Sequence, residues 1–241
     1  MTINSSSIPG NGIPASLKTS YSFSEAYNWL AEGWTLFKTA PVKLFLFCLL
    51  PMIISGCIQL IPGPAGMILS KWAGAFVVAS VWPVLSYLHH HAAFSVKSVL
   101  AAKNWLSVAV YSATGVIVAA QQFGVAYALA GDDAVAMFFH MSGTGIEVWH
   151  LSLIFASAVP LMTLLIFAPA RIFFAYQNPL RAVQDSISAV VKMWKPCCVI
   201  AIIQGLLLAL APYTILLSVV LSGPVLACTW YCVYQRYLSE H

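Results

Sequence analysis

The stretch that decides the fold is CCVIAIIQGLLLALAPYTILLSVVLSGPVLACTWYCVY, residues 197–234, which contains no Asp, Glu, Lys or Arg. A helix that crosses a bilayer needs about 20 mostly apolar residues, so this stretch is too long for one straight span. Pro212 and Tyr213 form the expected turn between two spans, although Pro212 could instead kink a single long helix. The sequence therefore predicts that the chain crosses a membrane here, once or twice.

The composition of the whole chain agrees with a membrane location. Of its 241 residues, 61% are hydrophobic and only 7% are charged, whereas soluble domains carry about 25% charged residues. A water-soluble fold could not cover its surface with so few charges. The net charge of +4 is small and is spread along the chain, so we expect no nucleic-acid partner.

The apolar runs predict an all-α, polytopic membrane helix bundle of about six transmembrane helices. The expected spans are 42–62, 66–88, 105–130, 150–170, 197–213 and 215–235. A tight hairpin at IPGPAG, residues 61–66, separates the first two. Residues 1–20 are rich in Ser, Gly, Pro and Asn and are expected to form a flexible cytoplasmic tail. Residues 21–241 are then a single transmembrane domain.

The distribution of basic residues predicts the orientation, because cytoplasmic segments are enriched in Lys and Arg. With the N-terminus in the cytoplasm, the inner segments hold ten of the eleven basic residues, namely Lys18, Lys38, Lys43, Lys97, Lys103, Arg171, Arg181, Lys192, Lys195 and Arg236. Only Lys71 lies toward the outer side, where its long stem could reach the headgroups. We expect both termini in the cytoplasm and a location in a bacterial inner membrane. A count of five spans would move Arg236 outside and stays open.

The segments between the spans on the inner side are amphipathic. Residues 178–194 begin with Asn178 as a helix N-cap and Pro179 at the first helical position. Their apolar stripe consists of Leu180, Val183, Ile187, Val190, Val191 and Trp194. Residues 22–37 begin with Ser22 and Glu25 as a capping box, and their stripe consists of Phe23, Tyr27, Leu30, Trp34 and Phe37. Residues 94–105 are a weaker example. We expect these helices to lie along the inner leaflet.

Inside the spans the polar side chains are neutral, since no Asp, Glu, Lys or Arg falls near the middle of any of them. The intramembrane polar candidates are Gln121, Gln122 and Gln204. Hydrogen bonds between helices are their expected role, and the lining of a polar pathway is the alternative. Close helix packing is expected where small residues recur four apart, as at Gly115, Gly205 and Gly223.

The stretch GDDAVAMFFHMSGTGIEVWH, residues 131–150, is interpreted as a solvated outer loop, because it is the longest one and has no basic residue. Two chemical alternatives stay open. Met137, His140 and Met141 offer thioether and imidazole groups that suit copper, and Cys228 and Cys232 share a helix face near the opposite end. Asp132, Asp133, His140 and His150 could form a catalytic site, but no nucleophile motif frames them. The six cysteines all lie in apolar runs, so we expect free thiols.

One stretch resembles a known group. AYNWLAEGWTLFKTAPVKLFLFCLL, residues 26–50, is similar to the start of an uncharacterised family of bacterial six-helix inner-membrane proteins. The resemblance rests on Gly33-Trp34, Leu36-Phe37 and Pro41, and on GPVLACTWYCVYQRYL, residues 223–238, near the other end. It implies a topology but no activity and no functional residues.

Three classes of function remain open for such a chain. We favour a non-enzymatic inner-membrane protein that works through contacts in the bilayer, such as an immunity protein against a pore-forming toxin or an assembly partner. A transporter of a small solute or copper would bring Gln121, Gln204 and the thiols to one cavity. An enzyme at the outer face would bring together the acids and histidines of residues 131–150. Membrane lipids and another membrane protein are the expected partners, a homo-oligomer stays possible, and no cofactor is expected.

Overall fold

The structure, a computed structural model, describes residues 21–61, 63–140 and 145–239, and all its regular elements over these ranges are helices. The predicted N-terminal tail, residues 1–20, lies outside the described residues. The helices are α1 (Glu25–Phe37), α2 (Pro41–Gln59), α3 (Pro64–Ala79), α4 (Val81–His91), α5 (Lys97–Ala101), α6 (Trp105–Tyr111), α7 (Ala113–Ala130), α8 (Asp132–His140), α9 (Val148–Ser157), α10 (Val159–Leu165), α11 (Ala168–Phe174), α12 (Pro179–Lys192), α13 (Trp194–Ala209) and α14 (Leu217–Tyr237).

The predicted all-α membrane bundle is confirmed, and the chain is a multi-pass membrane protein. Within the described ranges, five helical segments are long and apolar enough to cross a bilayer, namely Pro41–Gln59, Pro64–His91, Trp105–Ala130, Val148–Phe174 and Leu217–Tyr237. A sixth candidate is the pair α12 and α13, which is bent by 100° between its two helices. The chain turns between Ala209 and Leu217, so the two-helix interpretation of residues 197–234 is correct.

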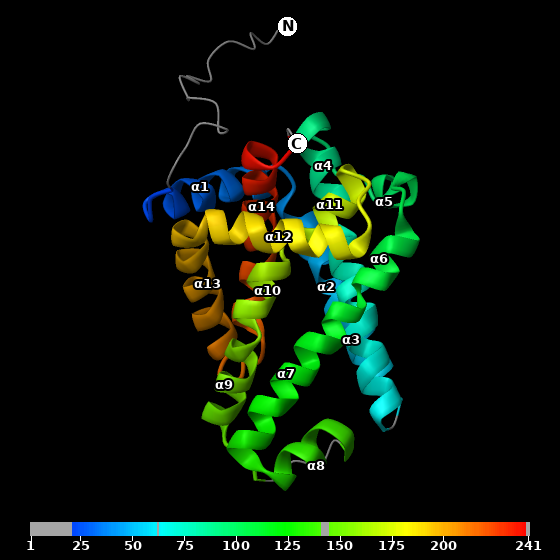
Figure 1. Cartoon of the computed structure of the whole chain (residues 1–241), viewed down its shortest axis with the longest axis vertical. Coiled ribbons are helices and arrows are strands. Elements are labelled where there is room, and N and C mark those ends of the chain that lie inside the picture. Colours follow the sequence, from blue (N-terminus) through cyan, green and yellow to red (C-terminus); the bar gives the residue numbers. More distant parts are fainter. Residues whose placement is uncertain (1–20, 62, 141–144, 240–241) are drawn as a thin grey trace, which may run out of the picture.

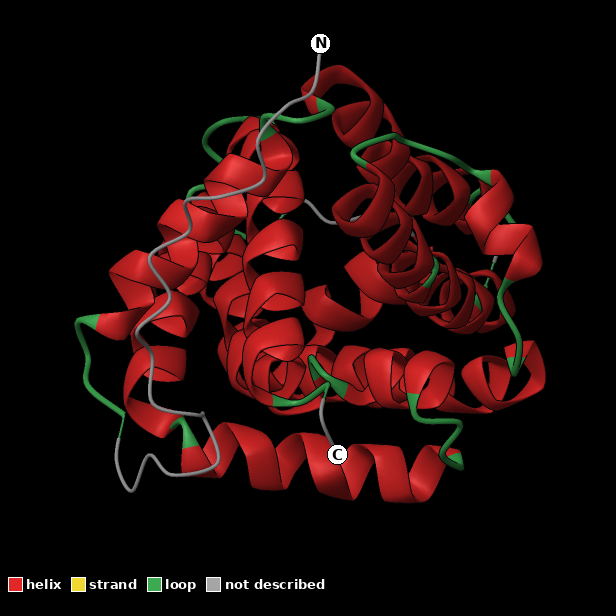
Figure 2. Ribbon diagram, turned by 90° about the horizontal axis from the view of Figure 1, so that it is seen from above, coloured by secondary structure: helices red, strands yellow, loops and turns green. Residues whose placement is uncertain are grey.

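The long segments close into a ring. Each touches the next along the chain through the pairs α2 and α3, α3 and α7, α7 and α9, α9 and α13, and α13 and α14, and α14 returns to α2. The hairpin between α2 and α3 needs Gly63, whose φ of +83° favours glycine. In Figure 1, α1, α5 and α12 lie at one end of the ring, here named the terminal end, and α8 lies at the other, the α8 end. Figure 2 views the bundle from the terminal end.

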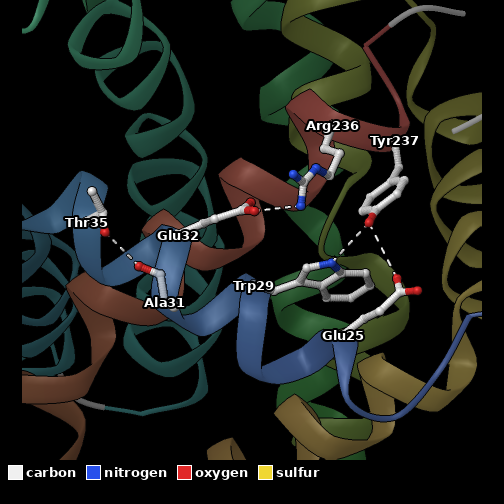
Figure 3. Close-up of polar contacts among 7 residues, drawn as sticks. All are labelled: Glu25, Trp29, Ala31, Glu32, Thr35, Arg236 and Tyr237. Atoms are coloured by element: carbon white, nitrogen blue, oxygen red, sulfur yellow. Dashed lines mark hydrogen bonds and ion pairs between the residues drawn. The ribbon is translucent and has the colours of Figure 1, made fainter. Parts of the chain in front are cut away.

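Helix α1 packs on α14, but with a different face from the predicted one. Its buried residues are Ala26, Trp29, Gly33 and Leu36, whereas Phe23, Tyr27 and Trp34 of the predicted stripe are exposed. The indole Nε1 of Trp29 donates to the Tyr237 hydroxyl, which donates to Glu25 in turn, each over 3.4 Å (Figure 3). Glu25 therefore faces Tyr237 and forms no capping box with Ser22. Arg236 pairs with Glu32 at 2.5 Å.

Helix α12, like α1, packs on the bundle with a face that differs from the predicted apolar stripe. Asn178 caps it as predicted, because its Oδ1 accepts from the Arg181 amide at 2.9 Å. The face turned to the bundle consists of Ala182, Ser186, Ala189 and Val190. The larger members of the predicted stripe, Leu180, Ile187, Val191 and Trp194, are exposed. In both helices small residues form part of the contact with the bundle, together with Trp29 and Leu36 of α1 and Val190 of α12, while several large apolar side chains point away from it.

Ser186 of α12 forms hydrogen bonds with the backbone at a break in the spanning segment Val148–Phe174. The segment is interrupted between α10 and α11, just before Pro169. The buried Ser186 hydroxyl donates to the Leu164 carbonyl at 2.7 Å and accepts from the Phe167 amide at 3.1 Å. Backbone groups freed near a proline are thus satisfied by a neighbouring helix, which is how membrane proteins tolerate such breaks.

We expect Ser186→Ala to lower the free energy of unfolding by about 1–3 kcal/mol, since it leaves the buried Phe167 amide without an acceptor. Thermal unfolding of the purified protein in detergent measures the change. Ser152→Ala is the matched control, because the Ser152 hydroxyl bonds only the Val148 carbonyl of its own helix. Equal losses in the two variants would contradict a role for Ser186 at the break.

The main core lies at the terminal end. It joins α1, α4, α11, α12 and the adjoining ends of α2, α13 and α14, and its largest fully buried side chains include Trp29, Phe167, Trp230, Tyr231 and Tyr234. A separate small cluster of Ala126, Ala134 and Ile154 lies at the α8 end. The ring is therefore filled with aromatic side chains at the terminal end, while its α8 end has a much smaller core.

Candidate functional site

Small residues allow α2, α3 and α7 to pack closely, and an intramembrane cavity lies beside these contacts. A Cβ added at Gly115 of α7 would lie 2.5 Å from the Lys71 carbonyl oxygen and 2.8 Å from the Ala75 Cβ of α3. A Cβ added at Gly74 of α3 would lie 2.5 Å from the Ser55 hydroxyl of α2. The small-residue packing predicted at Gly115 is thus confirmed, whereas a Cβ at Gly205 or Gly223 would meet no close neighbour.

The cavity has a volume of about 260 Å³ and opens between α3, α7 and α10. Its polar lining consists of Ser55, Ser70, Lys71, Tyr111, Thr114 and Gln122, and the rest of the wall is apolar, including Trp82 and Met162. Several of these polar groups already bond the backbone. The Tyr111 hydroxyl donates to the Leu165 carbonyl at 3.2 Å, and the Ser55 hydroxyl donates to the Ser70 carbonyl at 3.2 Å.

A second, larger hollow of about 660 Å³ lies at the α8 end and is here named the outer groove. Its walls are the α2–α3 hairpin and α8, with Gln59, Met67, Val135, Met137, Phe138 and Phe139 among the lining residues. Phe138 and Phe139 hold α8 on α7 by edge contacts with Phe123, at 5.4 and 5.3 Å between ring centroids.

Lys71 lines both the intramembrane cavity and the outer groove. Among the described lining residues it is the only Lys or Arg, and none of them is Asp or Glu. Within the described ranges no ion pair reaches Lys71; the ion pair found there joins Arg236 and Glu32. An unpaired ammonium group among apolar walls is unfavourable, and an anion beside it would be stabilised. The sequence had placed Lys71 only at the headgroups.

Two of the three predicted intramembrane glutamines bond a neighbouring helix, as expected. The Gln121 Nε2 donates to the Ser157 carbonyl at 2.7 Å, and the Gln122 Nε2 donates to the Ile154 carbonyl at 3.2 Å. Gln204 lies half-buried on α13 and lines neither hollow. Gln122 reaches the cavity, but its lining contains no cysteine. The convergence that a transporter would require of Gln121, Gln204 and the thiols is therefore not found in this cavity.

The metal candidates do not come together among the described residues. Met137 lines the outer groove, but Met141 and the side chain of His140 lie outside the described part of the chain. Cys228 and Cys232 are packed in the main core. All six cysteines are free thiols, as predicted. Over the described residues, no group of three or more His, Cys, Asp or Glu could hold a metal ion.

The interpretation of residues 131–150 as a loop is wrong for its first half. Residues Asp132–His140 form α8. Asp132 and Asp133 occupy its first turn, where negative side chains interact favourably with the helix dipole. Ala134 of α8 is fully buried against α7 and α9. Asp132 and Asp133 are exposed at the start of α8. His150 lies at the start of α9, with its ring tilted by 35° to that of Trp149 and the ring centroids 3.8 Å apart.

No family model, curated protein or solved structure matches the chain. The resemblance of residues 26–50 to an uncharacterised six-helix family stays a prediction.

Proposed function

We propose that the protein is a non-enzymatic integral protein of a bacterial inner membrane that works by contacts within the bilayer. Its partner is an apolar segment of another membrane protein, which enters the outer groove and places a carboxylate against Lys71. The observation that carries the proposal is the position of Lys71 on the walls of both hollows with no ion-pair partner in the described ranges.

The charge of Lys71 supports an acidic partner. A lysine costs roughly 2.5–3.5 kcal/mol at the centre of a membrane helix on insertion scales. Lys71 lies nearer one end of its span, Pro64–His91, so its cost is smaller, and a paired carboxylate offsets part of it. Apolar side chains of the partner fit the remaining walls, of which Met67, Val135 and Phe138 are examples. A binding site of this kind combines apolar anchors with one charged contact that fixes the register.

The filled core at the terminal end supports the binding of a partner protein rather than the passage of a solute through the bundle. Trp82, Trp230 and Tyr231 are nearly fully buried there, and Trp82 also lines the end of the intramembrane cavity. A molecule that enters the intramembrane cavity meets Trp82, behind which the core is filled. A protein that holds a pore-forming toxin closed, or one that assists the assembly of another membrane protein, requires such a surface and no solute pathway.

The proposed orientation places the terminal end in the cytoplasm. Lys38, Arg181 and Lys192 lie at that end, whereas the acidic Asp132 and Asp133 lie on α8, in agreement with the rule that basic residues stay inside. The exposed Tyr27 and Trp34 of α1 and Trp194 beside α12 then lie at the inner leaflet, where aromatic residues are enriched. Both termini are cytoplasmic in this arrangement.

The proposal is tested by photo-crosslinking in cells that make the protein naturally. Phe139 of the outer groove is replaced by the photoreactive residue p-benzoylphenylalanine, and adducts are identified by mass spectrometry. We expect a protein adduct, whose identity distinguishes a toxin from an assembly partner. Adding Lys71→Met should reduce the adduct about tenfold or more, because an unpaired buried carboxylate costs several kcal/mol.

Two controls make the result specific. Lys71→Arg keeps the charge and should retain most of the adduct. The same photoreactive residue at Ile202, which is 63% exposed on α13, reports general contacts with the bilayer. Adducts at Phe139 that contain only lipid, or a protein adduct indifferent to Lys71→Met, would refute the proposed contact.

A further inference from the structure

A third hollow, at the terminal end, is lined by cationic side chains. It has a volume of about 470 Å³ and lies between α4, α5 and α11. The side chains that matter for its chemistry are Tyr87, His90, His91, Lys97, Lys103 and Tyr176. Over the described part of the chain, its lining includes no Asp or Glu. Asp185, which accepts a hydrogen bond from Gln177 beside Tyr176, is not part of the wall.

The two lysines come from opposite ends of one short connection. Lys97 is the first residue of α5, and Lys103 follows it in the link to α6. The Asn104 side chain ties this link to α11, because its Nδ2 donates to the Ile172 carbonyl at 3.1 Å. Both lysines are exposed and line the hollow. Each ammonium group is a hydrogen-bond donor, so an anion in the hollow could accept hydrogen bonds from both.

The ring Nδ1 atoms of both histidines are held by backbone carbonyls of α4. The His90 Nδ1 lies 2.8 Å from the Ser86 carbonyl, and the His91 Nδ1 lies 3.1 Å from the Tyr87 carbonyl. Because a carbonyl oxygen only accepts, each Nδ1 carries the proton, and each Nε2 is left for other partners. The His91 ring is also fixed by stacking on Tyr87, at 4.2 Å between ring centroids.

Backbone strain is concentrated around this hollow. Five residues other than glycine have a positive φ within the described ranges, and three of them border it. Ala92 (φ +49°) follows His91, Asn104 (φ +67°) follows Lys103, and Tyr176 (φ +52°) lines the wall. Such conformations cost about 1–3 kcal/mol each and persist where the surroundings hold them, often at binding sites.

We propose that this hollow, here named the cationic pocket, binds a phosphate group, carried by a lipid headgroup or by a soluble phosphorylated molecule. Lys97 and Lys103 supply the positive charge, as lysine commonly does for phosphate. The hydroxyls of Ser95 and Ser98 lie on the same wall. The pocket is at the opposite end of the ring from the outer groove, so it does not depend on the partner proposed for Lys71.

The test compares two double variants that remove the same charge. Lys97→Gln with Lys103→Gln changes the cationic pocket. Lys38→Gln with Lys192→Gln changes two exposed lysines of the terminal end that do not line the pocket. The purified protein in detergent is titrated with inorganic pyrophosphate by calorimetry, and separately with phosphatidylglycerol by native mass spectrometry. Thermal unfolding verifies that both variants fold like the parent chain.

We expect the pocket variant to weaken binding about tenfold or more, since hydrogen bonds to charged groups are the stronger ones. The control variant should change it less than about twofold, since separated surface charges are largely screened. A specific loss for phosphatidylglycerol alone assigns the pocket to a lipid headgroup, and a specific loss for pyrophosphate alone assigns it to a soluble phosphate. Equal weakening by the two double variants, or no binding of either probe by the parent chain, would overturn the proposal.

Discussion

Gly33→Val is expected to release α1 from the bundle and to lower the free energy of unfolding by about 1–3 kcal/mol or more. A Cβ at Gly33 would lie 2.2 Å from the Thr229 hydroxyl oxygen and 2.6 Å from both the backbone nitrogen and the Cα of Thr229. A side-chain rotation of Thr229 cannot relieve contacts with its own backbone. The two helices must therefore separate.

The loss should be cooperative because the rest of the α1 interface depends on this approach. Thr229 is fully buried, and its hydroxyl is already engaged with the Val225 carbonyl at 2.9 Å. Separation of α1 and α14 also weakens the bond from Trp29 to Tyr237 and the ion pair between Glu32 and Arg236 (Figure 3). Thermal unfolding in detergent measures the effect.

Gly124→Ala is the matched control. Gly124 lies inside α7, and a Cβ there would meet no atom within 4 Å. Alanine is favoured over glycine in a helix by up to about 1 kcal/mol, so this variant should unfold at the same temperature or slightly higher. If Gly33→Val unfolded like Gly124→Ala, the close packing of α1 on α14 would be incorrect.

The same contact gives a structural meaning to the two stretches on which the family resemblance rests. Residues 26–50 contain α1 and Gly33, and residues 223–238 contain Thr229, Arg236 and Tyr237. These stretches lie at opposite ends of the sequence but pack against each other in the bundle. Gly33 is required here because its side of α1 touches the backbone of α14, whereas Trp34 is exposed.

The spanning segments were predictable because bilayer thickness sets their length and hydropathy is a local property of the sequence. The span expected at 105–130 coincides with Trp105–Ala130. The breaks within the spans were harder to predict. Pro51 and Pro224 lie inside uninterrupted helices, whereas the break before Pro169 depends on Ser186, which comes from a different helix.

The predicted apolar stripes are only partly right, since Phe37, Val183 and Val190 pack in or against the core but most of the other members are exposed, and the reason is physical. In water, the large apolar side chains of a surface helix face the protein. In a membrane protein the opposite side of the helix can also be apolar, and close contact favours small residues. Ala26 and Gly33 of α1, and Ala182 and Ser186 of α12, therefore face the bundle, while Tyr27 faces away.

The hollows could not be predicted from the sequence because their residues come from separate helices. Lys71 was recognised as the one basic residue of the outer side, but nothing in its neighbourhood along the chain points to Gln122 or Tyr111. Lys97 and Lys103 were predicted only to lie in inner segments, and His90 and His91 end a different helix, α4. Only the fold of α4 back onto α5 and α11 places them around one hollow.

Trp230→Ala is expected to be the most destabilising single substitution, at about 3–5 kcal/mol. Trp230 is 2% exposed, and its ring makes an edge contact with Phe167 at 5.6 Å between centroids. Phe167 lies at the break between α10 and α11, where its amide is bonded to Ser186. The cavity left by Ala would therefore loosen both the core of the terminal end and the break that it supports. Thermal unfolding of the purified protein measures the loss.

Trp230→Phe separates the contribution of packing from that of hydrogen bonding. The Trp230 indole nitrogen has no hydrogen-bond partner within the described residues, so phenylalanine removes no bond to them and keeps an aromatic ring against Phe167. We expect it to cost clearly less than Trp230→Ala, because phenylalanine fills more of the space of the indole and leaves a smaller cavity. A loss as large as that of Trp230→Ala would mean that the indole N–H, rather than the ring, is what the core requires.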